Sequence, residues 1–215
     1  MKKKGIIFDM DGVIIDSEPL HCQCTIETLK DFGVEITLSD MDKYIGVADH
    51  VMVDSLINEF SINVSRDEFL KRQDEKRLVV FNKESMVSVS GTIELIQYLY
   101  DNGLKLGLAS SSPRYFIEMV LNNFDLLKYF TIIVSGEELE RSKPHPDIYL
   151  KAAEQIGISP IDCVAIEDAN AGVRSAKAAG MYTIGYQNPN SGAQDLSAAD
   201  VVIQDMKEVC KLFKF

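Results

Sequence analysis

Short apolar runs rich in β-branched residues alternate with helical patterns along most of this chain. Strands that alternate with helices predict a parallel sheet, because right-handed crossovers place the helices on both of its faces. Pro146 opens one of these helices and Gly157 ends it, with Tyr149 on the apolar face between them. Ser112 can cap another, with Pro113 at its first position. We therefore expect an α/β fold around one parallel sheet, with strands at residues 5–9, 104–109, 131–134, 163–166, 182–186 and 201–203.

The alternation stops between residues 16 and 84, where helical signals continue without a convincing strand. Ser17 can cap a first helix, and Val53 with Leu56 marks the apolar face of a second. Ser65 and Glu68 form a capping-box pattern for a third. We expect residues 16–84 to form an inserted all-α domain, and residues 1–15 and 85–215 to form the core domain.

The chain of 215 residues carries 33 acidic and 22 basic residues, a formal net charge of -11. This charge opposes nucleic acid and anionic membranes, so neither is expected as a partner. No apolar run approaches transmembrane length, and Asp9 and Asp11 interrupt the apolar stretch behind the first lysines, so we expect a cytoplasmic protein. An acidic protein can bind an anionic substrate if a cation and a few hydrogen-bond donors lie in the pocket, so we expect a metal ion there. The oligomeric state stays open, with a monomer favoured.

Two carboxylates one residue apart, Asp9 and Asp11, stand where the first strand ends. Carboxylates are costly at the end of a buried strand unless they are paired or bind a metal. Gly12 lets the chain leave the strand, so the two acids can address one pocket from different sides. On its own the pattern is equally typical of a turn capped by aspartate.

Three later strand ends also carry polar side chains, and they favour a shared pocket over a turn capped by aspartate. The carboxyl ends of parallel strands converge on one crevice, where these groups would meet the two aspartates. Carboxylates, a hydroxyl and a lysine around one crevice fit phosphoryl transfer, because a carboxylate can accept phosphate and Mg²⁺ prefers carboxylate oxygens. The groups are Ser110 with Ser111 and Ser112, Lys143 between Ser142 and Pro144, and Glu167 with Asp168.

These motifs, in this order, resemble the haloacid dehalogenase superfamily, and within it the β-phosphoglucomutase-like phosphatases. The resemblance covers nearly the whole chain and implies a Rossmann-like core with a helical cap inserted after the first strand. It rests on Asp9-Met10-Asp11-Gly12-Val13, on Ser110, on Lys143 within Ser-Lys-Pro-His-Pro-Asp, and on Glu167-Asp168 followed by Ala171-Gly172.

The resemblance also implies a role for each matching residue. Asp9 would be the nucleophile, and Asp11 the general acid and base. Ser110 and the amide of Ser111 would hold the phosphoryl group, and Lys143 would stabilise its negative charge. The resemblance further implies a magnesium ion held by Asp9, by Asp11 through its carbonyl, by Asp168, and by Glu167 directly or through water.

The inserted domain bears on which of two activities the chain has. The positions expected to contact substrate there are Glu18, His21 and Gly46. The sugar mutases place an arginine shortly after a Gly-Val pair, whereas this chain has Asp49, which would repel a second phosphate. We therefore expect a magnesium-dependent phosphatase acting on a small phosphorylated metabolite, a sugar or polyol monophosphate. The alternative is a β-phosphoglucomutase-type mutase in which a run of basic residues replaces the charge of the missing arginine. Such a run is more typical of a solvated helix face. Its residues are Lys71, Arg72, Lys76 and Arg77.

A phosphorylated-aspartate switch without turnover is a less favoured alternative. Receiver domains of this kind also gather acids, a hydroxyl and a lysine around magnesium. They are much shorter than this chain, and they carry the phosphorylated aspartate on a later strand. A catalytically idle binding module is disfavoured too, because every motif residue is present.

Overall fold

The computed structural model describes residues 3–45, 47 and 49–212. The chain divides into two compact units, one formed by Met1–Asp16 with Val87–Phe215 and the other by Ser17–Met86. The chain passes between them twice, and both passages lie side by side where Ile15 pairs with Ser88. The amide of Asp16 donates to the carbonyl of Val87 at 2.9 Å, which ties the two passages together at the edge of the first unit.

The first unit is built on a six-stranded sheet in which every neighbouring pair is parallel. Its strand order is β3-β2-β1-β4-β5-β6. Each predicted strand is present, with its ends shifted by at most one residue, so the predicted α/β fold is confirmed. The strands are β1 (Gly5–Phe8), β2 (Lys105–Ser110), β3 (Phe130–Ser135), β4 (Cys163–Glu167), β5 (Tyr182–Tyr186) and β6 (Val201–Ile203).

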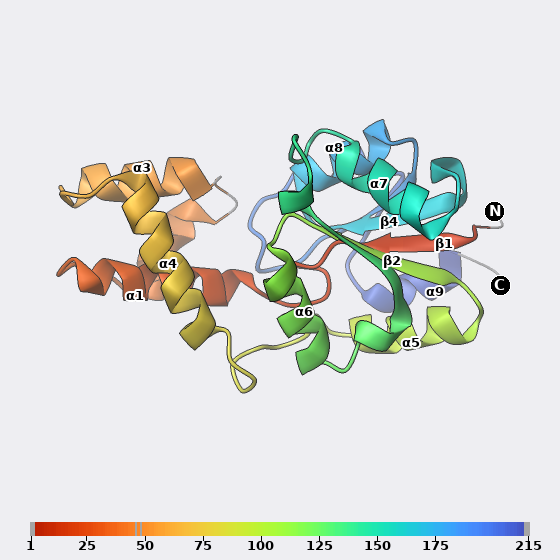
Figure 1. Ribbon diagram of the computed structural model, residues 1–215, viewed down its shortest axis with the longest axis horizontal. Helices are drawn as coiled ribbons and strands as arrows, with labels where there is room; N and C mark the ends of the chain where they lie inside the picture. Colours follow the sequence, from red (N-terminus) through yellow and green to blue (C-terminus); the bar gives the residue numbers. More distant parts are fainter. Residues whose placement is uncertain (1–2, 46, 48, 213–215) are drawn as a thin grey trace. The chain divides into compact units, whose positions relative to one another are not determined.

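Helices cover both faces of this sheet, as Figure 1 shows for the first unit. One face carries α7 (Asp147–Ile156) and α8 (Asn170–Ala178), and the other carries α5 (Thr92–Asp101), α6 (Arg114–Asn123) and α9 (Val209–Leu212). Gly157 ends α7 in the left-handed conformation, as predicted. The apolar face of α7 packs on the sheet through Tyr149, Ala152 and Ala153, all buried in one cluster with Ile7 of β1.

The position of β1 in the sheet determines where a ligand can bind. β1 lies between β2 and β4, and the strand order turns there: β2 and β3 lie on one side, and β4, β5 and β6 on the other. In an open parallel sheet a crevice forms at the carboxyl ends of the strands beside such a switch point. The residues that follow β1, β2 and β4 therefore border one crevice.

The second unit contains only helices among its described residues. These are α1 (Glu18–Asp31), α2 (Leu38–Met41), the 3-10 turn η1 (Asp42–Tyr44), α3 (Asp49–Glu59) and α4 (Arg66–Val80). Its core includes Leu29, Leu56 and Phe69, none of which is exposed. No described helix has the length and apolar character needed to cross a membrane.

Two of the three caps proposed for these helices and for α6 differ in detail from the sequence prediction. Ser65 accepts a hydrogen bond from the amide of Glu68 at 3.2 Å, as a helix cap does. Ser17 precedes α1, but its side chain makes no capping hydrogen bond. Ser112, which we expected to cap α6, lies one residue too early, because the helix is preceded directly by Pro113.

Candidate active site

The first aspartate of the motif lies at the switch point of the sheet. Phe8, the last residue of β1, pairs with Leu108 of β2 and with Ile166 of β4. Asp9 is the next residue, and its amide donates to the carbonyl of Ile166 at 3.0 Å. The strand register therefore brings Asp9 beside Glu167, the last residue of β4.

Three carboxylates gather at this point. Asp9, Glu167 and Asp168 each offer an oxygen, and these oxygens all lie within 4.8 Å of one another. The residues are nearly closed to solvent, with 7%, 0% and 6% of their surface exposed. Such a concentration of buried carboxylates is unfavourable unless cations balance it.

Lys143 supplies one of these cations. Its Nζ donates to Oδ1 of Asp9 at 2.8 Å, to Oε1 of Glu167 at 2.6 Å and to the carbonyl of Ala109 at 3.2 Å. Its side chain is only 9% exposed. Burial acts to lower the pKa of Lys143, but Asp9 and Glu167 outweigh it and raise the pKa above its usual range, so the ammonium keeps its proton.

One ammonium does not neutralise three buried carboxylates. Burial, followed by repulsion from Glu167, raises the pKa of Asp9 well above its usual value. The same two causes raise the pKa of Asp168 to about 7. The cluster therefore holds a surplus of negative charge that a further cation would relieve.

The donor set fits a hard divalent cation. All the donors are carboxylate oxygens, which Mg²⁺ and Ca²⁺ prefer over softer ligands. Oε2 of Glu167 is buried and accepts no hydrogen bond from any residue that the structure describes. An acidic cluster that could hold a metal ion is thus present, as the sequence predicts.

Two glycines make room for these carboxylates. Gly12 has a φ of +69°, and a Cβ there would lie 1.9 Å from Oδ2 of Asp168. A Cβ on Gly172, in the first turns of α8, would lie 2.0 Å from the carboxyl carbon of Glu167. The backbone therefore approaches two acidic side chains more closely than any other residue type permits.

Comparison with known proteins places this arrangement in a family. A family model described as haloacid dehalogenase-like hydrolase matches residues 6–186. The chain belongs to this family. It is 34% identical to hexitol phosphatase B of Escherichia coli (strain K12), over 94% of this chain and 92% of that protein. It is 28% identical to beta-phosphoglucomutase of Bacillus subtilis (strain 168), over 96% and 91% of the two chains.

A solved structure agrees with this assignment. The crystal structure of a haloacid dehalogenase family hydrolase from Deinococcus radiodurans R1, with bound phosphate and sodium, superposes with a TM-score of 0.77. It is 26% identical and covers 97% of this chain and 93% of that chain. The predicted resemblance, the Rossmann-like fold and the prediction of an enzyme of this hydrolase family are confirmed.

The close approach of Gly12 in this haloacid dehalogenase-like hydrolase predicts a stability difference between two alanine variants. Gly103 also has a positive φ, +79°, but a Cβ there meets nothing within 4 Å. Gly103→Ala should lower the free energy of unfolding by about 1 kcal/mol through backbone strain alone. Gly12→Ala should lose roughly a further 1–3 kcal/mol, because Asp168 has to move. Urea unfolding without added metal measures both losses, and equal losses would contradict the close contact.

Of the two serines expected to bind phosphate, Ser110 is the last residue of β2 and Ser111 follows it. Ser110 is fully buried, and its Oγ accepts a hydrogen bond from the amide of Ser112 at 3.1 Å. Ser111 is exposed. The phosphate-binding roles of Ser110 and Ser111 stay predictions.

Two serines without a predicted role of their own in the site contact its acids. The hydroxyl of Ser112 donates to Oδ2 of Asp11 at 2.9 Å. The hydroxyl of Ser191, in the loop after β5, donates to Oδ2 of Asp168. In the same loop Asn188 donates to the carbonyl of Gly12 at 2.9 Å. The polar sequence Gln-Asn-Pro-Asn-Ser-Gly directly after a predicted strand was the signal that could have found this loop.

The second unit contains the residues expected to contact substrate. Glu18 is the first residue of α1, and His21 lies one turn later, with its ring 5.0 Å from that of Phe81. Gly46 lies outside the described residues. None of these positions is tied to a ligand by the structure, so their roles stay predictions.

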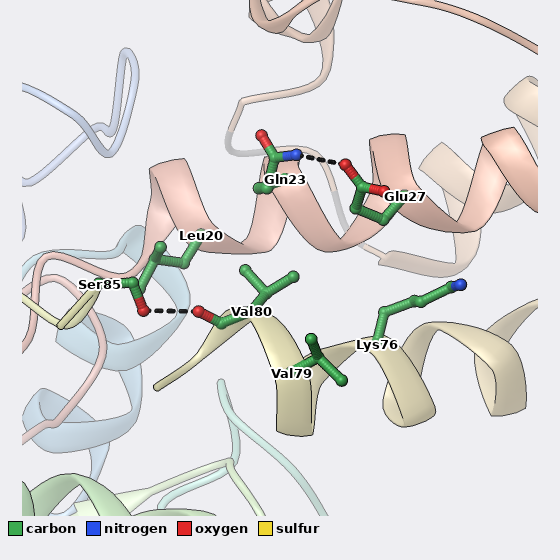
Figure 2. A pocket seen from close by; sticks show the side chains of 7 residues that line it. All are labelled: Leu20, Gln23, Glu27, Lys76, Val79, Val80 and Ser85. Carbon is green, nitrogen blue, oxygen red and sulfur yellow. Dashed lines mark hydrogen bonds between the residues drawn. The ribbon is translucent and has the colours of Figure 1, made fainter. Parts of the chain in front are cut away.

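A pocket of 420 Å³ opens between α1 and α4 of this unit, as Figure 2 shows. Its polar side includes Glu27, which accepts a hydrogen bond from Gln23 at 2.7 Å. Lys76, one of the basic residues considered as replacement charge, lines the pocket and also pairs with Asp31 at 2.8 Å. The full lining is Leu20, Gln23, Glu27, Lys76, Val79, Val80 and Ser85.

Proposed function

We propose that this chain is a magnesium-dependent phosphatase that removes phosphate from a small sugar or polyol monophosphate through a phosphorylated Asp9. The observation that carries the proposal is the buried group in which Lys143 contacts Asp9 and Glu167 while the cluster keeps a surplus of negative charge. The name of the hexitol phosphatase relative supports the substrate class.

Asp9 is the nucleophile in this proposal. Lys143 holds Oδ1 at 2.8 Å, so Oδ2 is the oxygen that attacks phosphorus. The bond from Oδ2 to phosphorus forms as the bond from phosphorus to the leaving alcohol oxygen breaks. Lys143 then stabilises charge on the transferring group, a role that a buried, fixed ammonium performs better than a solvated one.

Asp11 moves the protons. It first donates a proton to the departing alcohol, and it then takes a proton from the water that attacks the phosphorus of the phosphorylated Asp9. Inorganic phosphate leaves, and the Asp9 carboxylate is restored. The hydroxyl of Ser112 holds Oδ2 of Asp11 at 2.9 Å and so fixes the orientation of this acid.

A divalent cation would be held by Asp9, Asp168, Glu167 and the carbonyl of Asp11. When bound, it neutralises the repulsion between the Asp9 carboxylate and an incoming phosphate. Ser110 and the amide of Ser111 bind the phosphoryl oxygens. We also propose that the Ser17–Met86 unit is the cap, with Glu18, His21 and Gly46 contacting substrate.

Hydrolysis is favoured over the mutase alternative by Asp49, which would repel a second phosphate group. The mutase alternative is kept because a beta-phosphoglucomutase is among the relatives. The cytoplasmic location and the monomeric state stay predictions.

Phosphate release from a panel of hexitol, hexose and pentose monophosphates tests the proposal. We expect Mg²⁺-dependent release of inorganic phosphate that EDTA abolishes and added Mg²⁺ restores. Conversion of β-glucose 1-phosphate to glucose 6-phosphate without phosphate release would identify a mutase instead. A single round of protein phosphorylation without turnover would identify a switch.

A further inference from the structure

Tyr149 makes contacts that its position on the apolar face of α7 does not predict. The residue is fully buried. Its hydroxyl donates to Oε1 of Glu167 at 2.5 Å. The Nζ of Lys143 lies over its ring, 5.4 Å from the ring centre. Tyr149 therefore contacts two of the charged residues around Asp9, one through its hydroxyl and one through its ring.

A phenylalanine would fill the same space without the cost of burying a hydroxyl. A buried tyrosine hydroxyl needs a hydrogen-bond partner, and here the partner is a carboxylate that is itself fully buried. A phenol is protonated at neutral pH, so the hydroxyl of Tyr149 donates its proton to one oxygen of Glu167.

Glu167 in turn fixes Lys143. Its Oε1 accepts hydrogen bonds from Tyr149 at 2.5 Å and from Lys143 at 2.6 Å. Its carboxyl group also lies against the backbone of Gly172 in α8. A lysine side chain is a flexible stem that carries a point charge, so its ammonium is aimed only if its partners are fixed. From Glu167 the same Nζ reaches Oδ1 of Asp9 at 2.8 Å.

We propose that Tyr149 is a positioning residue that fixes Glu167 and, through it, aims Lys143 at Asp9. This inference rests on the proposed function, in which Asp9 is the nucleophile and Lys143 stabilises the transferring group. Nothing in the proposal requires Tyr149 to touch substrate. The effect of its hydroxyl should therefore pass entirely through Glu167.

Tyr149→Phe tests the proposal, because it removes only the hydroxyl. We expect kcat for p-nitrophenyl phosphate with Mg²⁺ to fall about tenfold with little change in KM, as is usual when an outer contact of a metal-site ligand is lost. We also expect Mn²⁺ to bind about tenfold more weakly to the substrate-free protein, measured by titration calorimetry. Tyr44→Phe is the matched control, because the hydroxyl of Tyr44 also donates to a glutamate, Glu59, at 2.7 Å.

Making Tyr149→Phe in a protein that already carries Glu167→Gln distinguishes a positioning role from a general loss of structure. If Tyr149 acts through Glu167, adding Tyr149→Phe to Glu167→Gln should change kcat and Mn²⁺ affinity by less than about twofold. An equal loss in both backgrounds would overturn the proposal, and so would a Tyr149→Phe protein that matches Tyr44→Phe in both readouts. Should Glu167→Gln not fold, the comparison with Tyr44→Phe decides alone.

The two proposals fail in different ways. A parent protein that releases phosphate and binds Mn²⁺, with Tyr149→Phe unchanged, overturns only the role of Tyr149. A parent protein that neither releases phosphate from the panel nor binds Mn²⁺ overturns the proposed function and this inference with it.

Discussion

Replacing Asp9 with asparagine is expected to lower phosphate release by about 10⁴-fold or more, because the amide cannot attack phosphorus. The substitution keeps the size of the side chain and removes one of the three buried carboxylates. Lys143 keeps its contact with Glu167 in this variant, so the ammonium is not left without a partner and the protein should stay folded. Stopped-time assays of inorganic phosphate from the best substrate of the panel measure the loss.

The control for Asp9→Asn is the same substitution at an exposed aspartate of the same unit. Asp101, the last residue of α5, is exposed and is not one of the motif residues. Asp101→Asn should release phosphate at the parental rate. An Asp9→Asn protein that is folded and retains more than about one-tenth of the parental rate would rule out Asp9 as the nucleophile.

Replacing Lys143 with methionine is expected to affect both stability and activity. The variant leaves Asp9 and Glu167 buried without the ammonium that contacts both of them. Loss of one partner from a buried ion pair typically costs about 3–5 kcal/mol, so we expect a fall of that size in the free energy of unfolding without metal. Phosphate release should fall by roughly 10²- to 10³-fold, as when a buried donor to the transition state is removed.

Added Mg²⁺ separates the two effects of Lys143→Met. A cation that binds the surplus carboxylates should restore part of the stability but not the rate, because it does not replace the donor to Asp9. Lys43→Met is the control, since Lys43 pairs with Glu59 at the surface and its side chain is 56% exposed. Such an exposed pair contributes little to stability, because solvent screens it. Equal losses in urea unfolding for the two variants would contradict the account of the buried cluster.

The strands could be predicted almost residue by residue because they are short and mainly apolar. β1 and β4 are buried along their whole length, and β5 is buried after its first residue. Apart from Glu167 at the end of β4 and Thr183 in β5, these strands hold no polar side chain in their interior. The ends of helices were harder to predict. Ser17 has the residue type of a cap but makes no capping bond, and Ser112 bonds to Asp11 instead of to α6. A serine offers its hydroxyl to whichever partner the tertiary structure brings near it.

The acidic residues of the site could be predicted because they follow strand ends, whose convergence is a property of parallel sheets. Their supporting contacts could not, because those contacts join distant parts of the chain. Tyr149 was predicted only as an apolar-face residue, since helical spacing shows the face of a side chain and not the partner of its hydroxyl. Ser191 reaches Asp168 from the loop after β5, and no periodicity links the two positions.

The central claim is that the carboxylate of Asp9 is phosphorylated during turnover, and acid quenching tests it most directly. The parent protein is mixed with Mg²⁺ and an excess of its best substrate, quenched in acid within milliseconds, digested, and analysed by mass spectrometry. We expect a phosphoryl group on Asp9 in the peptide that contains it, lost on treatment with hydroxylamine as an acyl phosphate is, and absent from Asp9→Asn. Phosphate release at the full rate with no label on Asp9 at any quench time, or label on another residue, would contradict the account.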